Sequence, residues 1–128
     1  MKATLVRSLL LALVFASAVV SAADVAGKWK AEFQAPDGSQ MYNIFTFVVD
    51  GEKLTGTVYS SLSGADAKIE DGTIKGDELV FGVTRNIQGQ DIKLRYKGKV
   101  SGDEIPITMN AGLGDQTFEI KMTAKREK

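Results

Sequence analysis

Acidic residues beside glycines are the side chains of this sequence with the best prospect of chemistry. They recur in three short segments: Asp50-Gly51-Glu52, Gly76-Asp77-Glu78 and Gly102-Asp103-Glu104. Two carboxyl groups facing one groove can hydrolyse a glycosidic bond, and carboxylate oxygens also bind calcium. Hairpin turns, however, favour Asp and Gly for backbone reasons alone, and a calcium loop needs a denser set of ligands. We therefore interpret these acids as solvated turn residues, and we predict no catalytic residues and no metal site.

The composition narrows the chemistry further. The 128 residues include no Cys and no His, which excludes a disulfide framework, the usual zinc sites, a Ser-His-Asp triad and a Cys nucleophile. The 16 basic residues balance the 16 acidic ones, so the chain lacks the basic excess typical of nucleic-acid binding. We expect a protein that is not an enzyme, uses no cofactor and does not bind nucleic acid.

The first 22 residues have the pattern of a secretory signal peptide. Lys2 and Arg7 precede an apolar run from Leu9 to Ala16, and the small residues of 20–22 follow it. Cleavage after residue 22 or after residue 23 fits equally well. The uncharged stretch of 16 residues at 8–23 is shorter than the roughly 20 that a membrane-spanning helix needs. The pattern predicts a secreted or periplasmic protein without an integral membrane anchor.

From residue 24 onward, apolar and polar residues alternate with the period of a β-strand. Ile92, Leu94 and Tyr96, for example, alternate with charged residues. We predict a single domain over 24–128 with no substantial helix, and eight strands near 26–34, 41–49, 53–60, 67–74, 78–85, 90–99, 104–110 and 116–125. The short connections leave no room for crossover helices, so the strands should be antiparallel. The predicted fold is an all-β, eight-stranded, up-and-down barrel.

A short internal repeat supports this topology. The three acidic turn segments recur at offsets of 25 and 26 residues, about the length of one hairpin. In an up-and-down barrel these turns share one rim, so the opposite rim receives the connections 35–40, 61–66, 86–89 and 111–115. If the barrel has an opening, we expect it at this second rim. Pro106 falls inside the seventh strand, where it predicts a bulge or a poorly paired stretch.

The segment Gly27-Lys28-Trp29 opens the first predicted strand and resembles the G-x-W signature of lipocalins. In that family the Trp packs at the closed end of the barrel beneath an Arg from beyond the last strand, and Arg126 is the matching residue here. The resemblance implies that Gly27, Trp29 and Arg126 close the barrel. The chain looks like a shortened, bacterial-looking, exported member of the lipocalin-like, calycin-type barrels, which bind small apolar molecules inside.

The inward-facing side chains can form either a filled core or a ligand pocket, because eight strands enclose just enough space for one or the other. We predict no inward charge, so a neutral hydrophobic ligand fits better than an acid, whose carboxylate would be buried alone. The candidate ligand-binding residues are Phe45, Phe47, Tyr59, Phe81, Tyr96, Met109, Phe118 and Met122.

Two functions remain open at this point. The first is an exported, monomeric binding protein for a small hydrophobic molecule held inside the barrel. The second is a solid-core envelope or extracellular module that contacts a protein or a polysaccharide through its loops or outer face. The alternate cations Lys93, Arg95, Lys97 and Lys99 are the one basic patch suited to the second function, although such a stripe is usually only a solvated face.

Overall fold

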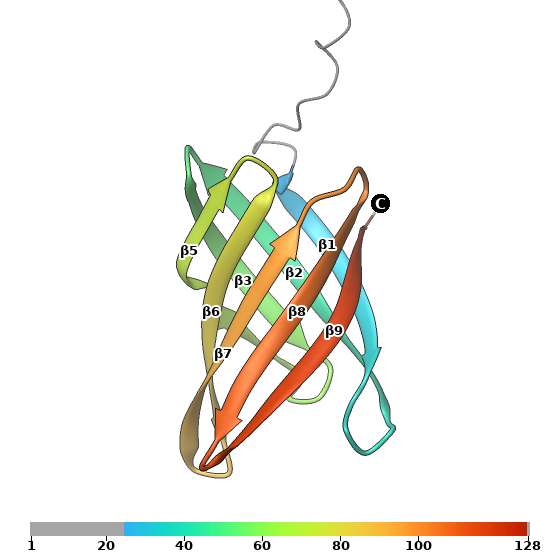
Figure 1. Ribbon diagram of the computed structural model, residues 1–128, viewed down its shortest axis with the longest axis vertical. Coiled ribbons are helices and arrows are strands. Elements are labelled where there is room, and N and C mark those ends of the chain that lie inside the picture. The colour runs from blue at the N-terminus through green and yellow to red at the C-terminus, as the bar shows by residue number, and fades with distance from the viewer. Residues whose placement is uncertain (1–24, 128) are drawn as a thin grey trace, which may run out of the picture.

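The computed structural model describes residues 25–127 and contains no α-helix within them. The predicted signal peptide, residues 1–22, lies outside this range. Every regular element is a strand (Figure 1): β1 (Gly27–Gln34), β2 (Gln40–Asp50), β3 (Lys53–Ser60), β4 (Ala65–Lys68), β5 (Glu70–Lys75), β6 (Glu78–Ile87), β7 (Gln90–Lys99), β8 (Glu104–Leu113) and β9 (Gln116–Arg126).

The strands form a closed antiparallel barrel, as the alternation predicts. Each strand pairs with the next along the chain, except that β3 pairs with both β4 and β5. Pairing of β9 with β1 closes the sheet. Because β4 and β5 together occupy one position beside β3, the nine strands fill the eight predicted positions of the barrel.

The strand predicted over 67–74 is therefore two strands, and this is a correction. The chain breaks at Ile69, which is buried and donates its backbone N–H to the carbonyl of Gly56 at 2.9 Å. The register between β5 and β6 then shifts between Glu70 and Thr73, where Asp71 has a φ of 51°. The bulge of this barrel lies here.

Pro106 does not create a bulge. It pairs with Thr123 in a continuous ladder between β8 and β9. On its other side, the ladder between β7 and β8 ends at the pair Gly98 and Ile107, so it stops one residue short of Pro106. The missing N–H of Pro106 therefore falls where one ladder has already stopped, which is the poorly paired stretch that we considered as the alternative.

The three repeated turns share one rim, as predicted. Gly51, Gly76 and Gly102 have φ values of 64°, 60° and 65°, a left-handed conformation that glycine adopts without strain. Gly56 in β3 is needed for a different reason. Its φ is 130°, and a Cβ at this position would overlap the backbone carbonyl oxygen of Thr46 on β2.

The half of the barrel next to this rim is filled. Phe45, Phe47, Phe81 and Tyr96 form one cluster with ring centroids 4.8 to 6.0 Å apart, and all four side chains are buried. Close contacts of this kind leave little free volume, so the cluster acts as a rigid floor across the barrel.

The opposite half is split into two walls. The ladder between β1 and β9 covers only residues 29–32 and 123–126, and the ladder between β5 and β6 ends at the pair Glu70 and Gly82. Toward the second rim, β1 to β4 therefore form one wall and β6 to β9 the other, with no ladder joining them among the described residues. In Figure 1 the β1–β2 hairpin at the lower right lies apart from the β6–β7 and β8–β9 hairpins at the lower left.

Candidate functional site

The closed end has the geometry that the G-x-W resemblance implies. Trp29 is fully buried, and its Nε1 donates to the carbonyl of Val25 at 2.9 Å. The Arg126 guanidinium lies over the indole at 4.3 Å from the ring centroid, a favourable cation–π arrangement. Gly27 has a φ of 118° and lies beneath Arg126 Nη1. Trp29 is therefore covered by Arg126 and shielded from solvent at this end.

A cavity of about 270 Å³ occupies the opposite half, above the aromatic floor. Its lining comes from both walls and is almost entirely apolar. The lining residues are Phe33, Ala35, Pro36, Met41, Asn43, Ser60, Leu62, Arg85, Ile87, Leu94, Tyr96, Met109, Ala111, Phe118 and Ile120. The cavity reaches the rim that we expected to hold an opening, where Leu62 and Ile87 expose apolar side chains to solvent.

The barrel is therefore neither solid nor hollow throughout. Of the eight candidate ligand-binding residues, Tyr96, Met109 and Phe118 line the cavity. Phe45, Phe47 and Phe81 do not line it, because they belong to the packed floor beneath.

Two further candidates also lie outside the cavity lining. Tyr59 is on the outer face, where its ring lies 6.0 Å from that of Tyr42, because β3 turns Val58 and Ser60 inward and Tyr59 outward. Met122 is buried but lies next to the cavity lining rather than in it. Its Sδ accepts a weak hydrogen bond from Asn43 Nδ2 at 4.0 Å.

Three polar residues of the cavity lining, Asn43, Ser60 and Arg85, were not predicted. Strand alternation could have found Asn43 and Arg85. Asn43 lies between the inward Met41 and Phe45, and Arg85 lies two residues beyond the inward Val83. The expectation that the cavity has no inward charge is therefore wrong, since Arg85 contributes to its wall.

The polar groups of the cavity influence one another. Burial raises the pKa of Tyr96 to about 12, while the charge of Arg85 and a side-chain hydrogen bond with Asn43 act to lower it. Tyr96 therefore keeps its proton at physiological pH and can donate a hydrogen bond into the cavity.

Arg85 also ties the two walls together where the ladder is missing. Its Nη2 donates to the carbonyl of Val58 at 2.7 Å, and its Nη1 to the carbonyl of Ala65 at 3.2 Å and to Ser63 Oγ at 3.4 Å. These oxygens belong to β3, β4 and their connection, so one side chain from β6 bridges the seam.

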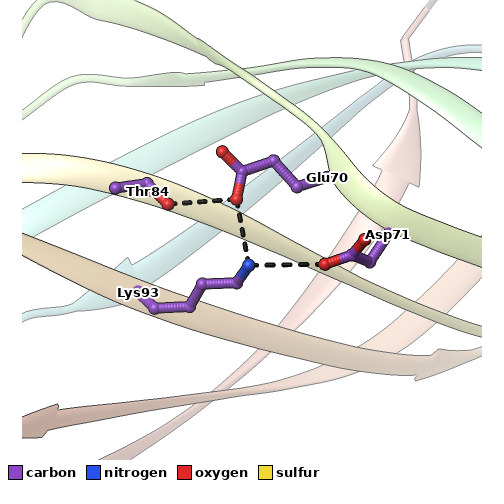
Figure 2. Close-up of polar contacts among 4 residues, drawn as sticks. All are labelled: Glu70, Asp71, Thr84 and Lys93. Carbon is purple, nitrogen blue, oxygen red and sulfur yellow. Dashed lines mark hydrogen bonds and ion pairs between the residues drawn. The ribbon is translucent and has the colours of Figure 1, made fainter.

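Just below, the same seam is held from the outside by an ion-pair cluster (Figure 2). Lys93 Nζ lies 3.0 Å from Glu70 Oε1 and 3.5 Å from Asp71 Oδ2, and Thr84 Oγ1 donates to Glu70 Oε1 at 3.0 Å. Hydrogen bonds from Lys93 and Thr84 lower the pKa of Glu70, and the hydrogen bond to Glu70 raises that of Lys93. The lysine stem crosses β6 over Gly82, where a Cβ would lie 2.9 Å from Lys93 Cε.

The larger hollows of the molecule lie on its outer face. One of about 560 Å³ runs over the β1–β9 seam, and one of about 410 Å³ follows the gap between β4 and β6. Their linings are mainly charged and polar, and they suit water better than an apolar ligand. We therefore take the smaller interior cavity as the candidate site.

The part of the chain that the structure describes holds no group of three or more acidic side chains arranged to bind a metal ion. No helix in the same part is long and apolar enough to cross a membrane.

Comparisons of the chain with protein-family models, with curated proteins and with solved structures find no match. The class of the protein is therefore defined by its geometry. It is a closed, eight-stranded antiparallel β-barrel, consistent with a lipocalin-like barrel in strand number, strand direction and closure.

Proposed function

We propose that this protein is a lipocalin-like binding protein that carries a small, largely apolar molecule in its interior cavity, without chemical conversion of the ligand. The observation that carries the proposal is the apolar cavity of about 270 Å³ above a packed floor. Burial of apolar ligand surface contributes about 25 cal/mol per Å², and the rigid floor avoids the cost of ordering the site on binding.

The size of the cavity sets the scale of the ligand and of its affinity. A cavity of roughly 150 Å³ accommodates benzene, so 270 Å³ suits about ten non-hydrogen atoms. At ~0.5 kcal/mol per atom, such a ligand binds with about 5 kcal/mol, a Kd of roughly 0.1 to 1 mM if the whole ligand lies inside. A molecule that also contacts Leu62 and Ile87 at the rim would bind more tightly.

The test is native mass spectrometry of the protein purified from its exported fraction, combined with titration of an apolar fluorescent probe. Ala111→Trp places an indole into the cavity, and Asn110→Trp adds the same side chain on the exposed face of the same strand. We expect an added mass or probe enhancement in the wild type and in Asn110→Trp, and its loss in Ala111→Trp. A bare polypeptide mass with no probe enhancement would refute the proposal.

That negative result would favour the second function, a module acting through its outer face. The structure weakens the argument for this second function from the basic stripe at 93–99, because two of its four cations lie near carboxylates. Lys93 is paired with Glu70 and Asp71, and Lys99 lies 4.0 Å from Asp77. Only part of the stripe is thus left as an uncompensated patch, so binding in the cavity is the better supported proposal.

Export is part of the proposal and rests on the signal-peptide pattern of residues 1–22. The expected result is a mature chain that begins at residue 23 or 24 and is found outside the cytoplasm. N-terminal sequencing of the exported protein measures both. A full-length chain that stays in the cytoplasm would contradict this part of the proposal and leave ligand binding untouched.

A further inference from the structure

Arg85 crosses the seam between the two walls close to the rim at which the barrel opens. Its hydrogen bonds go to the carbonyls of Val58 and Ala65 and to Ser63 Oγ, all on the first wall. No ladder joins β4 to β6, and toward the rim from the Glu70 cluster no other hydrogen bond crosses this seam within residues 25–127. The last stretch of the seam is therefore hydrogen-bonded through one side chain.

The same hydrogen bonds position the two exposed apolar side chains at the cavity mouth. Leu62 and Ile87 both line the cavity, yet they are 75% and 41% exposed. Leu62 precedes Ser63 in the connection between β3 and β4, and Ile87 lies two residues beyond Arg85 on β6. Because Arg85 is bonded to the segment that carries Leu62 and lies on the strand that carries Ile87, its hydrogen bonds set how far apart the two walls stand at the mouth.

The backbone holds the two walls together weakly at this height. β4 has only four residues and pairs only with β3 among the described strands. On the opposite side of the barrel, the ladder between β1 and β9 stops at the pair Glu32 and Thr123. Segments with few backbone partners open locally at a small cost in free energy. At the other rim, ladders join the walls on both sides and the aromatic floor is close-packed. The walls can therefore part at the mouth while the rest of the barrel stays closed.

From this arrangement we infer that Arg85 is a latch: the walls part at the mouth when its hydrogen bonds break, and this opening controls how fast a ligand enters and leaves the cavity. The inference rests on the proposed function and adds a gate to the same site. All partners of Arg85 are uncharged, and no carboxylate within residues 25–127 forms an ion pair with it. Opening therefore leaves no buried anion unpaired, and water can replace the lost hydrogen bonds.

The experiment measures the association and dissociation rate constants of the apolar fluorescent probe by stopped-flow mixing with the exported chain. Arg85→Met keeps an unbranched side chain in the wall and removes the hydrogen bonds, so both rate constants should rise about tenfold. Arg95→Met removes the same charge from the outer face of β7, opposite Gly82, and should leave both unchanged. An association rate constant that does not rise in Arg85→Met would overturn the inference, because a residue that only contacts the ligand acts mainly on dissociation.

A second measurement keeps Arg85 in place, because its replacement can also destabilise the barrel. The chain contains no Cys, so the double variant Asp66→Cys/Asn86→Cys carries one thiol on each side of the seam, in the outer hollow between β4 and β6. A reducible thiol-specific cross-linker should slow entry and exit of the probe about tenfold, and reduction should restore both rates. The control Val80→Cys/Lys97→Cys places the same link across the ladder between β6 and β7, within one wall, and should have no effect. Unaltered rates in the protein cross-linked across the seam would overturn the inference.

The two proposals fail in different ways. If the probe binds and Ala111→Trp abolishes its binding, but neither Arg85→Met nor the cross-link across the seam changes its rates, the cavity binds ligands without a latch. If the probe does not bind to the unaltered protein, the proposed function itself is wrong and the inference falls with it.

Discussion

The division of the barrel into a packed half and an open half predicts that two phenylalanines of the same core have very different effects on stability. Phe81 is 1% exposed and touches the rings of Phe45, Phe47 and Tyr96. Phe118 projects toward the same interior but lines the cavity and is partly exposed. The perturbation is therefore the matched pair Phe81→Ala and Phe118→Ala.

The expected magnitudes follow from what surrounds each ring. Truncating Phe81 leaves a sealed void in addition to the lost burial, and such changes cost about 3 to 5 kcal/mol. Truncating Phe118 only enlarges an existing opening, so the cavity cost is absent. Since the ring is only partly buried and already faces the cavity, we expect a loss of about 1 kcal/mol.

Urea denaturation measures both values. With a slope of roughly 1 to 3 kcal/mol per M for a domain of this size, Phe81→Ala should lower the midpoint by about 2 M and Phe118→Ala by about 0.5 M. Equal losses would mean that the second half of the barrel is packed as tightly as the first. A loss below about 1.5 kcal/mol for Phe81→Ala would mean that the aromatic floor is not a close-packed core. Either result refutes the division.

Three further predictions concern single positions. Gly56→Ala would place an alanine at a φ of 130° and its Cβ against the backbone of β2, so the free energy of unfolding measured in urea should fall by about 3 kcal/mol or more. The control Gly112→Ala, whose Cβ meets nothing nearer than 4.0 Å, should be tolerated. Lys93 lowers the pKa of Glu70, so the contribution of this pair to stability is present above the ordinary pKa of 4.5 and is lost as the pH falls through the lower folded value. Glu70→Gln should therefore lower the stability at pH 7 and flatten the dependence of stability on pH in acid. An unchanged acid profile would exclude the pair as a stabilising contact. The pKa of Tyr96 is about 12 against an ordinary 10.0, so stability should fall between those two pH values, because the tyrosine of the unfolded chain ionises first. Absorbance titration should show one tyrosine that ionises late, and Tyr96→Phe should remove this signal. A late ionisation that persists in the variant would belong to another tyrosine.

Most of the barrel follows from local patterns in the chain. Strict alternation of apolar and charged residues, as in Ile92 to Lys97, identifies a strand and its inward face, because successive side chains of a strand point to opposite sides. The repeated glycine turns identify the hairpins and place them at one rim. Trp29 and Arg126, far apart in sequence, could be paired only by resemblance, and the structure places them in contact.

The candidate site was only partly predictable for two physical reasons. Alternation tells which side chains face the interior but not at what height they lie, so Phe45, Phe47 and Phe81 could not be separated from the cavity residues. Alternation also assigns Asn43 and Arg85 to the interior, but their polar character argues against burial, and the conflict disappears only when their partners are known. Those partners come from other strands: Val58 on β3 for Arg85, and Met122 on β9 for Asn43.

By itself, the sequence determined the all-β class, the number of strand positions and the rim at which the barrel opens, since these depend on periodicity and on turn residues that act locally. Only the tertiary structure decided where the barrel is filled and where it is empty. That depends on how far the β1–β9 and β5–β6 ladders extend, because side chains interlock where the strands are joined and leave space where the two walls part. The placement of Arg85 across one of these seams was decided in the same way, by strands that meet only in the folded protein.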